Sequence, residues 1–251
     1  MTAPTDYRAI IRRLLAIWDT ETNRTTVELR TDIDFQVTVL VRGLTAHAAD
    51  CARGVLTLYD ASQPVAAVPV IRSLMEDAVT AGWVLVVPDG WKAVVSEGSR
   101  TRAAVLRDAM AANASWADAA SEARRQEYAE QVKALGAAPP SYKVFEQRLR
   151  ALEGTDDMYM VYRYLSGLSH ASSETVDLYT APDPGSPLQV RYRRQASHSM
   201  AANLLVSAAS SLLHALIAWD MTQVGRPHQA ELDAIASELG VTNEWRAKAS
   251  S

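Results

Sequence analysis

Apolar side chains recur at steps of three and four residues along most of the chain, and proline or glycine marks the breaks between these stretches. This spacing places the apolar side chains on one face of an α-helix. The clearest case predicts a long helix over 32–61, whose inward stripe comprises Val37, Val41, Leu44, Ala48, Cys51, Val55 and Leu58. The same reasoning predicts further core helices near 65–87, 155–171 and 197–224.

The stretches outside these core helices are more polar. We expect a first amphipathic helix over residues 6–19 and a terminal helix over residues 227–240. The segment 91–152 is rich in Ala, Arg and Glu, which predicts peripheral helices there. We expect an irregular loop over 180–187, followed by at most one short strand or hairpin. The pattern as a whole predicts an all-α fold, a single helical domain over 1–251 built as a bundle with a charged helical insertion.

Composition narrows the class of protein. Of the 251 residues, 48% are apolar and 22% are charged, which is typical of a globular chain. The net charge of −4 argues against a broad nucleic-acid surface, although a local basic pocket for one phosphate stays compatible with it. Cys51 is the single cysteine, which excludes an intrachain disulfide and fits a reducing cytoplasm. We expect a cytoplasmic protein without membrane contact. The apolar stretch 203–221 carries several polar residues, and the N-terminal residues show no signal-peptide pattern.

The first candidate site lies in the helix predicted over 155–171. Seven residues at about 100° each bring Arg163 and His170 close to the same helix face, with Ser166 between them. Arg163 would hold an anion and His170 would move a proton, with Ser166 or Tyr159 contributing a hydrogen bond. The structural alternative places His170 at a helix C-terminus and pairs Arg163 with a carboxylate.

A second candidate pair is Arg72 and Glu76, which lie four residues apart inside an otherwise apolar helix. Charges in such a helix are costly unless they are paired. Glu76 could therefore orient His170 or bind a substrate, or it could form an internal salt bridge with Arg72 that fixes the register of the bundle.

Metal and cofactor motifs are missing from the chain. His47, one turn from Cys51, and His214, in the last core helix, could each ligate a metal, but histidines at such positions more often bond a neighbouring backbone or side chain. The chain contains no Glu-x-x-His, Walker or Gly-x-Gly-x-x-Gly motif. We therefore expect no metal and no cofactor.

Two short motifs carry a family resemblance. An Arg-x-x-x-Glu pattern at 72–76 and a Tyr-x-x-Leu-Ser-x-x-x-His pattern at 162–170 resemble an uncharacterised group of bacterial all-helical domains, which is in turn distantly similar to the HEPN superfamily. The resemblance covers about 32–178. It implies a homodimeric, metal-independent endoribonuclease of toxin or phage-defence systems, with His170 activating the ribose 2′-hydroxyl and Arg163 stabilising the phosphate. The chain departs from the HEPN pattern at Tyr164, where those proteins usually have a small polar residue.

Three functions follow from these observations. The first is an endoribonuclease that acts on RNA, with Arg163 and His170 essential. The second is a small-molecule enzyme or ligand-binding bundle, in which the polar face lines an apolar cavity of a few hundred Å³ bounded by Glu76 and His170. The third is a non-catalytic interaction or regulatory module, in which Arg72, Glu76 and Arg163 are buried and mutually paired.

Overall fold

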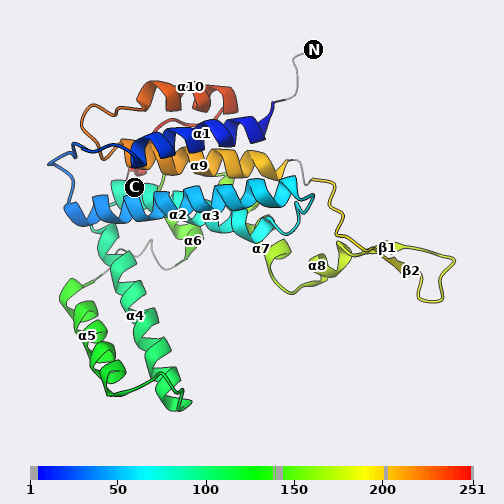
Figure 1. The fold of residues 1–251 in the computed structure, drawn as a ribbon, viewed down its shortest axis with the longest axis horizontal. Helices are drawn as coiled ribbons and strands as arrows, with labels where there is room; N and C mark the ends of the chain where they lie inside the picture. The colour runs from blue at the N-terminus through cyan, green and yellow to red at the C-terminus, as the bar shows by residue number, and fades with distance from the viewer. Residues whose placement is uncertain (1–4, 138, 140–143, 201–202, 250–251) are drawn as a thin grey trace.

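The computed structural model describes residues 5–137, 139, 144–200 and 203–249, which form ten helices and one two-stranded hairpin. The predicted all-α, single-domain fold is confirmed. The bundle is layered, with α10 over α1, α1 over α9, and α2 and α3 beneath α9 (Figure 1). Its elements are α1 (Tyr7–Thr22), α2 (Phe35–Asp60), α3 (Val68–Val86), α9 (Leu204–Asp220) and α10 (Gln229–Leu239).

Helix α9 is the centre of the bundle because it is apolar on nearly all sides. It packs against α1, α2, α3 and α10 (Figure 1), and its side chains at Leu212, Leu213 and Ile217 are fully buried. A helix that is hydrophobic all round is stable in water only when other helices surround it. Within the described residues, no helix combines the length and the apolar character needed to cross a membrane.

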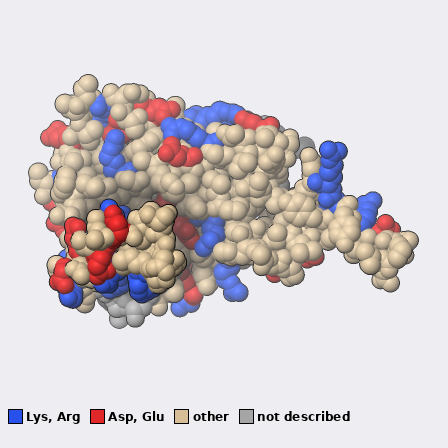
Figure 2. All heavy atoms as spheres, turned by 60° about the horizontal axis from the view of Figure 1, so that its bottom comes forward, with Lys and Arg blue, Asp and Glu red and all other residues tan. Residues whose placement is uncertain are grey.

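Helices α4 (Gly90–Ala111) and α5 (Ala119–Leu135) form a hairpin that projects away from the bundle (Figure 1). Pro88 follows the end of α3, and the chain turns at Asp89, which has left-handed backbone (φ 58°). Gly90 then begins α4 close to Trp83, where an added Cβ would approach the ring to 3.1 Å. Charges of both signs cover the hairpin, whereas the bundle surface between it and the β1–β2 hairpin is mostly uncharged in this view (Figure 2).

Helices α6 (Phe145–Arg150) and α7 (Met158–Ser169) lie against α3. The expectation that all of 91–152 is peripheral is wrong for α6, because Phe145 and Leu149 share one helix face and are both buried in the core. Helix α7 places Leu165 in the core and leaves its other side available to solvent. These two short helices position the predicted site residues.

A short arm joins α7 to α9 and contains α8 (Ser173–Asp177), β1 (Thr180–Pro182) and β2 (Val190–Tyr192) (Figure 1). The strands pair antiparallel, with Thr180 opposite Tyr192 and Pro182 opposite Val190. The hairpin agrees with the predicted strand near residue 190. The expected irregular loop over 180–187 is wrong for residues 180–182, which form strand β1.

Candidate functional site

Arg72 and Glu76 are paired with each other and with α7. The Arg72 Nη2 group donates to Glu76 Oε1 and to the Tyr162 hydroxyl, each at 2.8 Å, and that hydroxyl donates to Glu76 Oε1 at 2.9 Å. The guanidinium also lies 5.1 Å from the centre of the Tyr162 ring. Burial opposes the charge of Arg72, but the Tyr162 hydrogen bond and the Glu76 charge outweigh it and raise its pKa. The cluster therefore clamps α7 onto α3.

Arg163 lies on the outer side of α7, and Tyr159, one turn earlier, is half-buried against the core. Arg163 is exposed, and its side chain makes no hydrogen bond or ion pair with another described residue. Tyr159 bonds the carboxylate of Glu146 on α6, and this hydrogen bond raises the pKa of the Tyr159 phenol. Arg163 is thus a free cation beside an anchored tyrosine, which leaves it available to an anionic partner.

His170 lies just beyond the end of α7, which corrects the helix predicted over 155–171. The helix ends at Ser169, and His170 has extended backbone (φ −111°, ψ 159°). The chain turns here because Ser172 caps the next helix and donates to the Gly167 carbonyl at 2.9 Å. Arg163 and His170 therefore do not share the continuous helix face that the sequence predicted. His170 is nevertheless exposed to solvent.

The remaining predicted residues divide between two surroundings. The Ser166 oxygen is buried and has no hydrogen-bond partner among the described residues, so it does not join Arg163 at the surface. Glu76 bonds Arg72 and Tyr162, and none of its hydrogen bonds in the described structure goes to His170. Arg72 and Glu76 thus match the interpretation as an internal salt bridge, whereas Arg163 is accessible.

A pocket of about 340 Å³ lies along the side of α7 that faces α3 and α9. Its walls combine apolar side chains with hydroxyl groups and one imidazole, and neither Glu76 nor His170 contributes to it. The lining residues are Met75, Gly154, Asp157, Met158, Val161, Val206, Ser207, Ser210, Ser211, His214, Gly240, Val241 and Thr242.

His214 is a buried polar side chain of this pocket that carries an incomplete set of hydrogen bonds among the described residues. Only 6% of it is exposed, and burial lowers the pKa of its imidazole to about 4, so the ring is neutral at pH 7. Its Nε2 lies 3.1 Å from the Thr242 carbonyl oxygen and 3.3 Å from the Thr242 hydroxyl. Its Nδ1 is buried and has no hydrogen bond of normal geometry with a described residue, although the Ser210 backbone also acts on the ring and opposes the lowering of its pKa.

Two neutral forms of the ring fit these contacts. With the proton on Nε2, the ring donates to the Thr242 carbonyl and Nδ1 is an acceptor. With the proton on Nδ1, the ring directs its N–H group to the Ser210 backbone, and Nε2 accepts from the Thr242 hydroxyl. The first form leaves Nδ1 as a buried acceptor without a donor among the described residues, which is costly.

The segment after α10 holds His214 in place. The Trp245 indole donates to the His214 carbonyl at 2.9 Å, and the two rings lie 5.1 Å apart. Trp245 packs directly onto Gly82 of α3, where a Cβ would overlap the indole. The glycine in α3 thus allows the C-terminal segment to close one end of the pocket.

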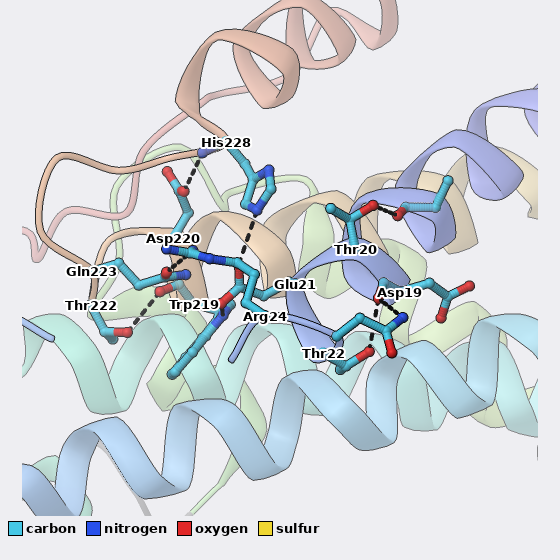
Figure 3. A network of polar contacts seen from close by, with 12 residues as sticks. Asp19, Thr20, Glu21, Thr22, Arg24, Trp219, Asp220, Thr222, Gln223 and His228 are labelled. Atoms are coloured by element: carbon cyan, nitrogen blue, oxygen red, sulfur yellow. Dashed lines mark hydrogen bonds and ion pairs between the residues drawn. The ribbon is translucent and has the colours of Figure 1, made fainter. Parts of the chain in front are cut away.

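A different polar cluster lies where α1 and α9 end, and here the carboxylate is fully paired (Figure 3). Trp219 donates to Glu21 Oε1 at 3.1 Å, while Arg24 and His228 contact Glu21 Oε2 at 2.9 and 3.0 Å. Burial raises the pKa of Glu21, but these three partners together outweigh it and lower the pKa. Glu21 is 1% exposed, so the cluster is part of the core.

A third cluster joins His47 and Cys51 of α2 to Asp77 of α3. His47 Nδ1 lies 2.7 Å from Asp77 Oδ2, and its Nε2 lies 3.8 Å from Cys51 Sγ. Burial raises the pKa of Asp77 to about 6, and burial together with the charges of Asp77 and Asp50 raises the pKa of the Cys51 thiol to about 11. The sequence predicts no metal site, yet these donors lie within 4.8 Å of one another.

A family model described as a family of unknown function (DUF5677) matches residues 38–187, which is more than half of the chain. The chain belongs to the DUF5677 family. The comparisons with curated proteins and with solved structures gave no match.

The DUF5677 match confirms the expectation of an uncharacterised family. The matched segment runs from the first turn of α2 to the loop between β1 and β2, so it includes the Arg72–Glu76–Tyr162 cluster, Arg163 and His170. His214 and Thr242, in contrast, lie beyond the DUF5677 segment. The pocket is therefore built jointly by α3 and α7 of that segment and by later parts of the chain.

Sequence reasoning missed two contacts that define these sites. Asp77 was not connected to His47, although the spacing of His47 and Cys51 already indicated that both face one side of α2. The partner of His214 is Thr242, which lies 28 residues further along the chain in a segment without helical pattern. No local signal indicates where such a segment packs.

Proposed function

We propose that this protein binds a small, largely apolar molecule that carries at least one hydrogen-bond donor, in the pocket between α3, α7 and α9. One observation carries the proposal: His214 Nδ1 is buried without a hydrogen bond of normal geometry to a described residue, and its ring lines a pocket of about 340 Å³. With the ring proton on Nε2, a ligand hydroxyl or N–H group would donate to Nδ1 and remove the cost of the unpaired acceptor.

The remaining walls support the same class of ligand. Met75, Met158 and Val161 offer apolar contacts, while Ser207 and Ser210 offer hydroxyl groups that can donate or accept. The one ionisable carboxylate in the lining is that of Asp157, and the imidazole is neutral. A pocket with so little charge favours an uncharged ligand over a phosphate or a carboxylate.

A matched pair of probes tests the proposal. 2-Naphthol and naphthalene have nearly the same shape, but only 2-naphthol has a hydroxyl donor. One added hydrogen bond contributes about 0.5–1.5 kcal/mol, so we expect 2-naphthol to bind about three- to tenfold more tightly in a calorimetric or fluorescence titration. Equal affinity for both probes, or binding of neither, would contradict the proposal.

A filling variant locates the binding. Ser207 is half-buried at the pocket wall, so Ser207→Phe should occupy the pocket and abolish 2-naphthol binding while the fold is retained. Ser237→Phe adds the same ring to an exposed position of α10 and serves as the control. Binding that survives Ser207→Phe would place the probe elsewhere on the protein.

A second candidate function is RNA cleavage of the HEPN-like type, and a specific observation favours it. Arg163 and His170 are both exposed near the C-terminal half of α7, and the Arg163 side chain has no partner among the described residues. In this proposal Arg163 holds the scissile phosphate, His170 moves the 2′-hydroxyl proton, and a homodimer brings two such pairs together, as the HEPN resemblance implies. The biological setting would be a toxin or a phage-defence system.

RNA cleavage is tested with a fluorescent RNA in the presence of EDTA. His170→Ala and Arg163→Ala should each lower the cleavage rate by about 100-fold or more without unfolding the protein. His198→Ala is the matched control, because it removes a histidine that is not part of the proposed Arg163–His170 pair. His198 lies in the arm and bonds Tyr164. Absence of cleavage by the wild-type protein, or an unchanged rate in His170→Ala, would end this candidate.

A further inference from the structure

The His47–Cys51–Asp77 cluster on α2 and α3 has the arrangement of a metal site. His47 and Cys51 are four residues apart and project from one face of α2, while Asp77 reaches them from α3. Helices α2 and α3 pack along much of their length, so these three side chains are held on a rigid support.

The distances match tetrahedral coordination by sulfur and nitrogen. Zinc lies about 2.3 Å from a thiolate and about 2.0–2.1 Å from an imidazole nitrogen, which places the two ligand atoms about 3.6 Å apart. Cys51 Sγ and His47 Nε2 are 3.8 Å apart. The other ring nitrogen, Nδ1, lies 2.7 Å from Asp77 Oδ2, and a carboxylate at that position commonly orients a metal-bound histidine.

We propose that Cys51 Sγ and His47 Nε2 bind a divalent cation of the zinc class, with Asp77 holding Nδ1–H and with solvent completing the coordination. Binding would release the thiol proton to solvent, because the thiolate is the ligand. The His47 side chain is 63% exposed, so a cation can reach the cluster from solvent on this side.

The charges around the cluster favour a cation. Asp77 and Asp50 both act on the Cys51 thiol. Two arginines close to the cluster in sequence are already engaged. Arg53 bonds Asp19 and Asp50, and Arg72 bonds Glu76 and Tyr162. Among the described residues, Asp77 has no lysine or arginine partner. Asp77 therefore supplies a negative charge beside the cluster that no lysine or arginine of the described residues neutralises.

The same three residue types could instead suggest a nucleophilic cysteine activated by histidine and aspartate. Such catalysis also needs donors for the developing oxyanion, most often free backbone N–H groups. Cys51 lies in the middle of α2, where the helix uses its own N–H groups in backbone hydrogen bonds. The burial and negative charge around Cys51 also disfavour a free thiolate. The arrangement therefore favours metal binding.

The single cysteine of the chain makes the test direct, because any thiol reagent reports on Cys51 alone. In the full-length protein we expect Zn²⁺ to slow the reaction of Cys51 with a disulfide reagent at least tenfold, and EDTA to restore the rate. Co²⁺ should give a thiolate charge-transfer absorption at one equivalent per chain. An unchanged thiol rate with Zn²⁺, or cobalt binding without this absorption, would overturn the proposal.

Variants separate ligation from a change in fold. His47→Gln should abolish the protection by Zn²⁺, and Asp77→Asn should weaken the apparent zinc affinity about 10- to 100-fold. His198→Gln, which removes a histidine of the arm, should leave the protection unchanged. Circular dichroism and the thiol rate without metal verify that each variant is folded. Protection that persists in folded His47→Gln would also overturn the proposal.

Discussion

The Glu21 cluster and the His214 pocket are both polar and both lie within the helical bundle, but the protein completes only one of them. Both carboxylate oxygens of Glu21 have partners from the chain itself, whereas His214 has a partner at Nε2 and none of normal geometry at Nδ1. A buried polar group that the chain completes stabilises the fold. One that stays incomplete beside an open volume indicates where another molecule can bind.

Removing the Glu21 carboxylate should have the largest effect on stability. Glu21→Ala leaves Trp219, Arg24 and His228 without their shared acceptor, so we expect the free energy of unfolding in urea to fall by about 3–5 kcal/mol. Asp19→Ala is the control, because its carboxylate pairs with Arg53 at the surface and should contribute less than about 1 kcal/mol. A loss below 1 kcal/mol for Glu21→Ala would show that the cluster is not structural.

The second effect is a dependence of stability on pH. The pKa of His214 is about 4 in the folded protein against an ordinary value of 6.5, so the unfolded chain takes up the proton first as the pH falls. The free energy of unfolding should therefore decrease between about pH 6.5 and pH 4, by up to about 3 kcal/mol from this group.

His214→Gln isolates this contribution, because glutamine keeps a donor for the Thr242 carbonyl and does not titrate. The comparison of variants is needed because Asp77 acts in the opposite direction. Burial raises its pKa from 3.8 to about 6, so its contribution is lost as the pH rises through that interval. Parallel pH profiles for the wild type and His214→Gln would contradict a buried neutral His214.

A smaller effect is expected where the C-terminal segment closes the pocket. Gly82→Ala places a Cβ against the Trp245 indole and should lower the free energy of unfolding by about 1–3 kcal/mol. Gly43→Ala in α2 has nothing within 4 Å of the added Cβ, so it should be neutral or stabilising by up to about 1 kcal/mol. Thermal unfolding of both variants measures the difference, and equal effects would mean that Trp245 does not pack on α3.

These regions also differ in how far the sequence predicted them. The spacing of apolar residues predicted the buried helix α9, and the four-residue spacing of Arg72 and Glu76 gave their salt bridge as one of two alternatives, because both signals lie in the local sequence. His170 was misplaced because the cap at Ser172, which starts a new helix, ends α7 earlier than the apolar pattern suggests. The contacts of Glu21 with His228 and of His214 with Thr242 join distant segments, and their formation depends on the packing of the whole bundle.

The most direct test of the account is the nitrogen-15 spectrum of His214 during a titration with 2-naphthol. We expect that Nδ1 carries no proton in the free protein, that its resonance moves in the direction of hydrogen-bond acceptance when 2-naphthol binds, and that naphthalene leaves it unchanged. A proton on Nδ1 in the free protein, or a resonance that 2-naphthol does not move, would contradict the proposal that this pocket recognises a hydrogen-bond donor.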